Sequence, residues 1–335
     1  MVQHPEVLVS VIIPCYNAGR WLRKSIASAL AQTHRPIEVI VVDDGSTDDS
    51  VNILRSYGDR IRFVQQPHVN GNHARNVGMS LSRGEYLQFL DADDYLLPEK
   101  VAAQVALLEA TGADAAYCDY AFLTHPDGAP RLGQFRTTGI QPDLLTALLQ
   151  GRWIPPHALL WRREVIEALG GWDETFFAAQ DYELMLRAAL QGLQLRYQPG
   201  HWAVVRRYGN VTVSTSDPLR RLWHRTRALE KVEHRLAQDE ALRKRYAPEL
   251  ARAYFRTARE LYPLDRRAAV QLCARSLSLD PAFAPRRSLA YDAAFGLLGF
   301  ERTEALVQVW RGLKRALGKI KAWWSESRRR RLSGC

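Results

Sequence analysis

The stretch IEVIVVDDGS, residues 37–46, is a run rich in Val and Ile that leads into a polar turn. Its β-branched residues predict a buried strand, because such side chains favour a pleated sheet. Gly45 permits a tight turn after the strand, and Ser46 or Thr47 is placed to cap a helix that continues through Tyr57. The stretch therefore predicts one strand–turn–helix unit.

The same unit recurs on both sides of this stretch. Short apolar runs predict further strands, and apolar residues at helical spacing predict the helices between them. The predicted strands cover 7–14, 61–66 and 85–94, and the predicted helices cover 20–32 and 72–82. This alternation predicts an α/β fold with a mostly parallel sheet that is flanked by helices on both faces.

Polar clusters follow three of the predicted strands, at residues 14–17, 43–46 and 91–94. Ligands of open α/β sheets bind beyond the carboxyl ends of the strands. Since these ends meet at one edge of a parallel sheet, the three clusters predict a single ligand site there.

The composition changes along the rest of the chain. The Gly-, Pro- and Thr-rich segment 124–142 is predicted to be a loop, and strand signals give way to Arg, Ala and Leu near residue 215. We therefore expect an α/β domain over 1–215, a smaller all-helical region over 216–300, and a basic amphipathic helix and tail over 301–335.

The positive charge is concentrated in that tail. Residues 301–335 hold ten Lys and Arg against three Glu, which gives +7 of the +10 carried by the whole chain. This distribution disfavours a broad nucleic-acid-binding face and predicts a local anionic partner instead. An apolar stripe runs along the same helix: Leu306, Trp310, Leu313, Leu317, Ile320 and Trp324.

A helix with an apolar stripe and a basic face is typical of contact with an anionic membrane surface. The alternative is a helix that packs on the protein's own core. No apolar run approaches 18 residues, so no transmembrane helix is expected, and no secretory signal is visible. With four scattered cysteines, the chain is expected to be cytoplasmic and peripheral on the inner face of the cell membrane.

The sharpest local signal for chemistry is LDADDYLLP, residues 90–98. Asp91 and Asp93 flank one alanine at the end of a predicted strand, so both carboxylates can bind one hard cation such as Mg²⁺ or Mn²⁺. Such an ion neutralises a diphosphate leaving group. The alternative interpretation is a solvated acidic turn.

Two further acidic sites stand out. Asp43 and Asp44 can accept hydrogen bonds from a nucleobase or a ribose, although the cluster can also serve only to cap a helix. Asp181 begins an apolar-periodic helix, where a carboxylate can take the proton of an acceptor hydroxyl. The alternative role of Asp181 is that of an N-cap, and the two roles can coexist.

Six motifs occur in a characteristic order: PCYN (14–17), VVDDGSTD (41–48), NHARNVG (72–78), FLDADD (89–94), LGGWDE (169–174) and QDYELMLR (180–187). Over about residues 8–215 the chain thereby resembles the family 2 glycosyltransferases, which have a GT-A fold. The resemblance implies a nucleotide-sugar donor, commonly with uracil as its base, and a divalent metal.

The resemblance also implies roles for single residues on the donor side. Pro14 and Tyr16 would line the pocket for the base, and Asp44, beside Asp43, would hydrogen-bond it. Arg75 would face the nucleotide. The sites of metal binding would be Asp91 and Asp93, with Asp93 as the direct ligand.

On the acceptor side, Asp181 matches the catalytic base of the family. The LGGWDE motif resembles a loop that closes on the acceptor, which would place Trp172 and Asp173 near a sugar. The motif of processive polysaccharide synthases, Gln-x-x-Arg-Trp, is absent, so a distributive enzyme is expected.

The chain departs from the family pattern at two positions. Gln180 stands where a Glu often precedes the base, and Tyr208 stands close to where many members have a histidine. Arg206, Arg207 or Tyr208 are candidates to replace that histidine. Two other histidines, His73 and His157, have no partner at metal-ligand spacing, and surface or structural roles are expected for both.

Together these features predict an inverting, metal-dependent transfer of a sugar to an acceptor hydroxyl, in surface polysaccharide or glycolipid synthesis. The expected partners are a nucleotide sugar, a carbohydrate or lipid-linked acceptor and an anionic membrane, with no nucleic acid. Two alternatives stay open: a sugar nucleotidyltransferase, although PCYNAGR lacks its Gly-rich phosphate loop, and an inactive membrane-associated scaffold. A dinucleotide dehydrogenase is disfavoured because no Gly-x-Gly-x-x-Gly follows the first strand.

Overall fold

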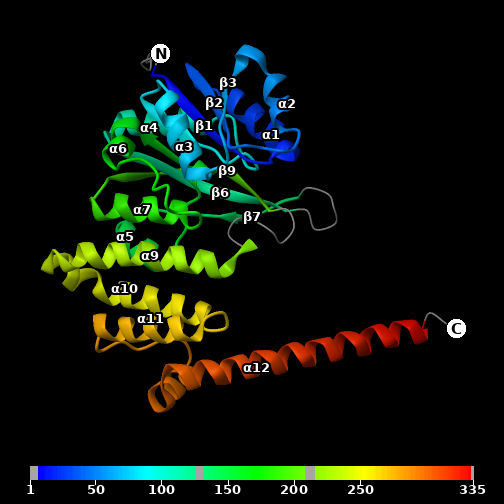
Figure 1. Cartoon of the computed structure of the whole chain (residues 1–335), viewed down its shortest axis with the longest axis vertical. Coiled ribbons are helices and arrows are strands. Elements are labelled where there is room, and N and C mark those ends of the chain that lie inside the picture. Colours follow the sequence, from blue (N-terminus) through cyan, green and yellow to red (C-terminus); the bar gives the residue numbers. More distant parts are fainter. Residues whose placement is uncertain (1–6, 125–130, 208–215, 333–335) are drawn as a thin grey trace. The chain divides into compact units, whose positions relative to one another are not determined.

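The computed structural model describes residues 7–124, 131–207 and 216–332 (Figure 1). The chain divides into two compact units, residues 1–235 and 236–335, which are described separately. The domain boundary that the sequence predicts near residue 215 falls in 208–215, outside the described residues, and stays a prediction.

The first unit is built on a nine-stranded sheet with the order β3-β2-β1-β4-β8-β6-β9-β5, and β7 pairs with β6 at one side. Its strands are β1 (Val9–Cys15), β2 (Ile37–Asp43), β3 (Arg62–Gln65), β4 (Tyr86–Phe89), β5 (Tyr95–Leu96), β6 (Ala115–Thr124), β7 (Arg131–Arg136), β8 (Leu159–Arg162) and β9 (Leu195–Arg207).

Helices and two short 3₁₀ turns connect these strands, and α9 follows the last of them. They are α1 (Gly19–Leu30), α2 (Ser50–Arg55), η1 (Gly58–Arg60), α3 (Gly71–Leu81), α4 (Lys100–Thr111), α5 (Leu144–Leu149), η2 (Pro156–Ala158), α6 (Arg163–Ala168), α7 (Gln180–Leu190) and α9 (Pro218–Ala237). The predicted α/β class with helices around a sheet is confirmed.

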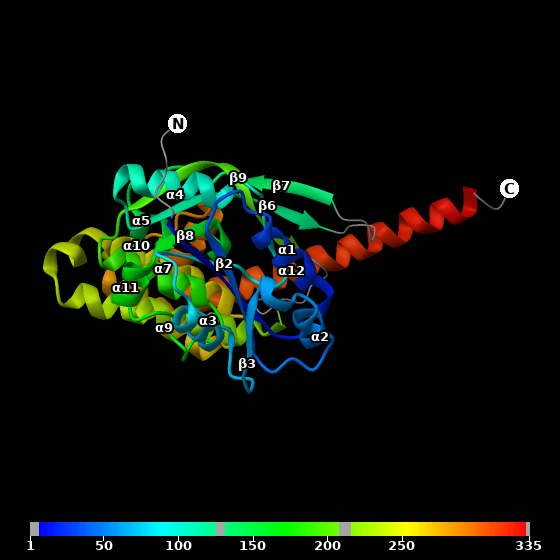
Figure 2. The ribbon, with the colours of Figure 1, turned by 90° about the horizontal axis from the view of Figure 1, so that it is seen from above.

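The alternation of side chains along β1 explains why helices cover both faces of the sheet. Val11 and Ile13 pack with Leu22 of α1 on one face. On the other face, Ile12 lies against α3 at Gly78, where an added Cβ would overlap the Cγ2 atom of Ile12. Figure 2 shows α1 and α3 on either side of strand β2.

The sheet is mixed, since the described strands form four parallel and four antiparallel pairs. The parallel half, β3-β2-β1-β4, is the half that the sequence pattern predicts. Strand β7 lies in the segment expected to be a loop, where it pairs with β6. The expectation of a plain loop over 124–142 is therefore wrong.

Strand β9 lacks a clear sequence signal because Pro199 and Gly200 interrupt it, and such residues weaken a strand. The register shifts there, from Cys118 paired with Gln198 to Asp119 paired with His201. The Asp119 carboxylate accepts hydrogen bonds from the Tyr197 hydroxyl (2.6 Å) and the Gly200 amide (3.3 Å). The irregularity is thus held by its own side-chain contacts.

The second unit contains the helices α10 (Glu240–Leu261), α11 (Arg266–Leu279) and α12 (Leu289–Leu332). Phe255 of α10 packs against the rings of Phe283 and Phe300. Helix α12 is interrupted at Gly299, which has a φ of 74°, and Glu304 beyond that point is fully buried and pairs with Arg259.

The predicted apolar stripe of α12 is exposed over its described side chains, at Leu306, Trp310, Leu313 and Leu317. The side chains of Ile320 and Trp324 lie outside the described residues. In the part of the chain that is described, no helix is both long and apolar enough to span a membrane.

Candidate active site

The polar clusters beyond β1, β2 and β4 meet in one cleft of about 1150 Å³. Several residues that the sequence singles out line this cleft: Pro14, Tyr16, Asp44, Arg75, Asp91, Asp93 and Asp181. Asp43, Trp172 and Asp173 are outside this lining set. The predicted convergence on one edge of the sheet is therefore observed.

The loops after β1 and β2 are tied to each other. The Asn17 amide donates to Ser46 Oγ (2.9 Å), and the Thr47 amide donates to Asn17 Oδ1 (2.7 Å). Helix α2 begins only at Ser50, so Ser46 and Thr47 do not cap it. The capping prediction is wrong because these two residues instead join the two loops.

Asp44 is buried beneath the cleft with its own protein partners. Its Oδ1 atom accepts hydrogen bonds from Gln66 Nε2 (2.6 Å) and the Val69 amide (3.0 Å), and His68 Nδ1 lies 2.9 Å from Oδ2. Tyr16, half-exposed above it, stacks on the His68 ring with centroids 4.0 Å apart. These contacts form a polar floor and an aromatic wall.

Arg75 is buried at the centre of the cleft wall. Its Nη2 donates to Asp91 Oδ1 (2.7 Å), and its Nη1 donates to Gln180 Oε1 (3.0 Å). The guanidinium also lies 4.5 Å from the ring centroid of Trp172, which is itself buried. One cation thereby joins the acidic cluster after β4 to the first turn of α7.

Asp173 is engaged with helix α9. Lys231 Nζ lies 2.6 Å from Asp173 Oδ2 and 2.5 Å from Oε1 of the buried Glu183. The acceptor-side role that the sequence predicts for Trp172 and Asp173 stays a prediction.

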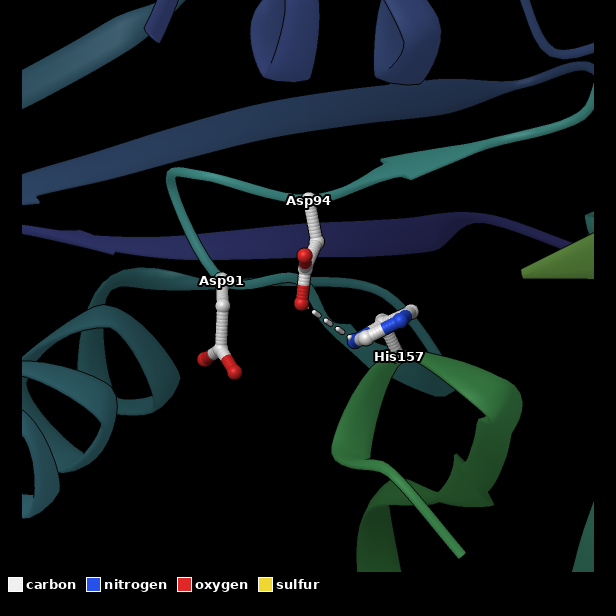
Figure 3. A group of neighbouring side chains, drawn as sticks. All are labelled: Asp91, Asp94 and His157. Atoms are coloured by element: carbon white, nitrogen blue, oxygen red, sulfur yellow. Dashed lines mark ion pairs between the residues drawn. The ribbon is translucent and has the colours of Figure 1, made fainter. Parts of the chain in front are cut away.

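Three ligand-type side chains gather where β4 ends: Asp91, Asp94 and His157 (Figure 3). Ligand atoms of the three lie within 4.8 Å of one another, and His157 Nδ1 lies 3.3 Å from Asp94 Oδ2. His157 stands on η2, 63 positions after Asp94, so residue spacing in the sequence gives no sign of the contact. The two buried ring nitrogens of His157 make no hydrogen bond with the described residues.

The electrostatics of this cluster suit a cation. Burial lowers the pKa of His157 to about 4, so its imidazole is neutral at pH 7 and offers a lone pair. Burial, followed by the charges of Asp93 and Asp91, raises the pKa of Asp94 well above its ordinary value. Carboxylates with one imidazole are a donor set that Mn²⁺ accepts, so the residues fit a divalent metal.

Asp93 lies beside this cluster with its side chain exposed. Partial desolvation of its carboxyl group by the surrounding protein, followed by the charge of Asp91, raises its pKa to about 6. Asp93 is not among the three grouped side chains, and its role as the direct metal ligand stays a prediction. Arg206 binds the loop from the other side, where its amide donates to Asp94 Oδ1 (2.6 Å). Tyr208 lies outside the described residues.

Asp181 lies in the first turn of α7, and its side chain is half-buried. The residue at the N-cap position is Ala179, in the left-handed region with φ 53°, so Asp181 is not the N-cap. Its Oδ1 accepts a hydrogen bond from the Tyr182 amide (2.9 Å), and its Oδ2 accepts one from Trp153 Nε1. Burial raises the pKa of Asp181, and the bond from Trp153 opposes that rise.

Residues 10–170 match the sequence model of the family described as Glycosyl transferase family 2. An uncharacterised glycosyltransferase of Rickettsia typhi is 32% identical over 191 residues, which cover 54% of this chain and 58% of that protein. One of Haemophilus influenzae is 35% identical over 166 residues, 48% of this chain and 65% of that protein. The chain thus spans about three fifths of the length of these relatives.

The fold is also similar to that of a solved structure, S. aureus TarS 1-349 in complex with UDP-GlcNAc. The TM-score is 0.56 at 16% identity, over 82% of this chain and 90% of that one. This likeness shows a GT-A-type fold. Residues 10–170, about half of the chain, form a family 2 glycosyltransferase domain.

Proposed function

We propose that the protein is an inverting glycosyltransferase that moves a sugar from a nucleotide diphosphate, with UDP as the carrier, to an acceptor hydroxyl. The observation that carries the proposal is the meeting of Asp44, Arg75, Asp91 and Asp181 in one cleft, although they come from four separate segments of the chain. The S. aureus TarS structures in complex with UDP-GlcNAc and with UDP support a uridine carrier.

Donor binding is assigned to the β1, β2 and α3 side of the cleft. Asp44 offers its carboxylate to the base, and Tyr16 offers the face of its ring for stacking. Arg75 faces the diphosphate, because its guanidinium lies between the acidic cluster and α7. A charged donor close to the leaving oxygens stabilises the negative charge that develops as the bond to the sugar breaks.

The metal site is assigned to Asp91 and Asp93, with Asp94 and His157 beneath them. A bound Mn²⁺ or Mg²⁺ would neutralise the diphosphate as it departs. In this chain His157 is a further candidate for the role of the family histidine, because it is the imidazole grouped with Asp91 and Asp94.

Asp181 is assigned as the base. Its carboxylate takes the proton of the acceptor hydroxyl while that oxygen forms a bond to the anomeric carbon of the donor sugar. The bond from this carbon to the diphosphate oxygen breaks on the opposite face, so the configuration inverts and a nucleoside diphosphate leaves. The raised pKa of Asp181 keeps it closer to the pH at which a general base is effective.

Product analysis with purified protein, candidate nucleotide sugars and Mn²⁺ tests the proposal. Release of a nucleoside diphosphate that depends on an acceptor supports a transferase. Release of pyrophosphate would instead identify a nucleotidyltransferase, and no product with any donor would favour the scaffold. Asp181→Asn should cut turnover by about 10² to 10⁴ with donor binding intact. The control is Asp59→Asn, an exposed carboxylate on η1.

We further propose that α12 binds an anionic membrane surface, where a lipid-linked acceptor would be concentrated. The support is the exposed stripe of Trp310, Leu313 and Leu317 beside basic residues. Deletion of α12 would also remove Glu304, which is buried in the second unit. Substitution of the exposed stripe therefore tests membrane binding better than deletion of the helix. Changing the three apolar residues to Gln should reduce co-sedimentation with anionic vesicles.

The matched control for the membrane experiment changes two other exposed leucines of α12, Leu289 and Leu297, to Gln. This variant should sediment as the wild type does. Equal sedimentation of all three proteins would contradict the proposal, and the electrostatic part of binding should weaken as salt is added.

A further inference from the structure

Trp153 lines the cleft and contacts the proposed base directly. It follows α5 in the sequence, and the residue is 39% exposed. Its Nε1–H donates to Asp181 Oδ2, and the Tyr182 amide occupies Oδ1. Both oxygens of Asp181 are thus held, and the side chain is fixed in one orientation.

The indole is supported independently of Asp181. Tyr120 of β6 meets its ring edge-on, with centroids 5.5 Å apart and an interplanar angle of 83°. The chain just before Trp153 is anchored to the end of α5, because the amides of Gly151 and Arg152 donate to the carbonyls of Leu148 and Ala147. A ring fixed in this way can orient a carboxylate without a large entropic cost.

We propose that Trp153 is a positioning residue for Asp181 and, with the exposed face of its ring, the platform on which the acceptor sugar lies. The inference rests on the proposed function, because it takes Asp181 as the base. The N–H holds Oδ2 so that its second lone pair is available to the acceptor hydroxyl. The apolar face of a sugar ring packs well on an indole, which brings that hydroxyl beside the carboxylate.

The two parts of the proposal separate by substitution. Trp153→Phe keeps an aromatic face and removes the N–H donor, whereas Trp153→Leu removes both. In Trp153→Phe, kcat should fall about tenfold or more, as expected for loss of a hydrogen bond to a charged group, with KM for the acceptor nearly unchanged. In Trp153→Leu, KM for the acceptor should rise as well.

The pH profile distinguishes positioning from a merely structural role. The charged groups that act on Asp181 in the described structure are Asp91 and Arg75, and both stay in place in the variants. Without the indole donor the carboxylate is less stabilised, so its pKa rises further. The acidic limb of kcat should therefore move to higher pH by about one unit.

The matched control is Trp223→Phe, which changes an exposed tryptophan of α9 outside the cleft lining. Donor binding by calorimetry and thermal melting should be unchanged in all these variants, which shows that they fold. The double variant Trp153→Phe, Asp181→Asn should be no slower than Asp181→Asn alone, because Trp153 acts through Asp181.

The outcomes separate the two proposals. If Asp181→Asn is as active as the wild type, the proposed function fails. If Asp181→Asn is inactive while Trp153→Phe keeps the wild-type kcat and acidic limb, only the positioning role is overturned. An unchanged acceptor KM in Trp153→Leu would overturn the platform.

Discussion

Lys231→Met should loosen the packing of α9 on the rest of the first unit. Lys231 Nζ lies between Asp173 Oδ2 (2.6 Å) and Glu183 Oε1 (2.5 Å), and Glu183 is 2% exposed. Methionine keeps most of the aliphatic stem and removes the charge. The change therefore tests the ion pairs with little loss of packing volume.

The expected cost follows from what each carboxylate retains. Removing one partner of a fully buried pair costs about 3–5 kcal/mol. Glu183 keeps Arg187, whose Nε and Nη2 each lie 2.8 Å from a Glu183 oxygen, and Asp173 keeps the Thr175 amide at 2.9 Å. Since Lys231 is also 40% exposed, we expect a cost of about 2 kcal/mol.

Thermal and urea unfolding measure this cost. In a unit of this size, about 2 kcal/mol corresponds to a fall in Tm of roughly 4–8 °C. The control is Lys244→Met, which makes the same change at an exposed lysine of α10 and should leave Tm within about 1 °C. If Lys231→Met matches that control, the two ion pairs do not stabilise the domain and the reasoning fails.

The same variant has a pH signature. Burial acts to raise the pKa of Asp173, but hydrogen bonds from Lys231 and Thr175 outweigh it and hold the pKa at about 2. A depressed carboxyl pKa contributes stability above its unfolded value, and this stability is lost as pH falls through the folded value. The stability difference between wild type and Lys231→Met should therefore shrink between about pH 4 and pH 2.

Two further predictions concern the core. Gly78→Ala should destabilise the fold by about 1 kcal/mol in urea unfolding, because overlap of the new Cβ with Ile12 outweighs the gain in helix propensity. The control, Ser80→Ala, changes an exposed residue of the same helix and should be nearly neutral. Equal stabilities of the two variants would contradict the close packing of α3 on Ile12. Burial lowers the pKa of Lys100 to about 7, so the unfolded state binds its proton more tightly than the folded state does. The free energy of unfolding should therefore rise from pH 7 to 9, and Lys100→Met should flatten this rise. Parallel curves of unfolding free energy against pH for the two proteins would refute the prediction.

The parallel half of the sheet could be predicted because its signals are local. The apolar runs around Ile12 and Ile40 are continuous, and each leads into a polar turn. The ends of these strands then bring Asp44 and Asp91 to one edge by topology alone. No knowledge of side-chain contacts is needed for this step.

The rest of the fold and site depends on contacts between distant residues. Strand β9 contains Pro199 and Gly200, and only its pairing with β6 makes it a strand. His157 contacts Asp94, which lies 63 positions earlier in the sequence, and Trp153 contacts Asp181, which lies 28 positions later. Neither contact follows a residue spacing that a helix or strand would produce, so periodicity cannot reveal them.

The position of Arg75 has a consequence for how mutational data on this cleft should be interpreted. One guanidinium contacts Asp91, Gln180 and the ring of Trp172. Substitutions at these three positions therefore share a partner, and their effects should not add. Residues that share a partner commonly show coupling energies of about 0.5–3 kcal/mol. The effect of a single substitution on stability or activity will therefore misstate the contribution of that residue. Double-mutant cycles that include Arg75 are required.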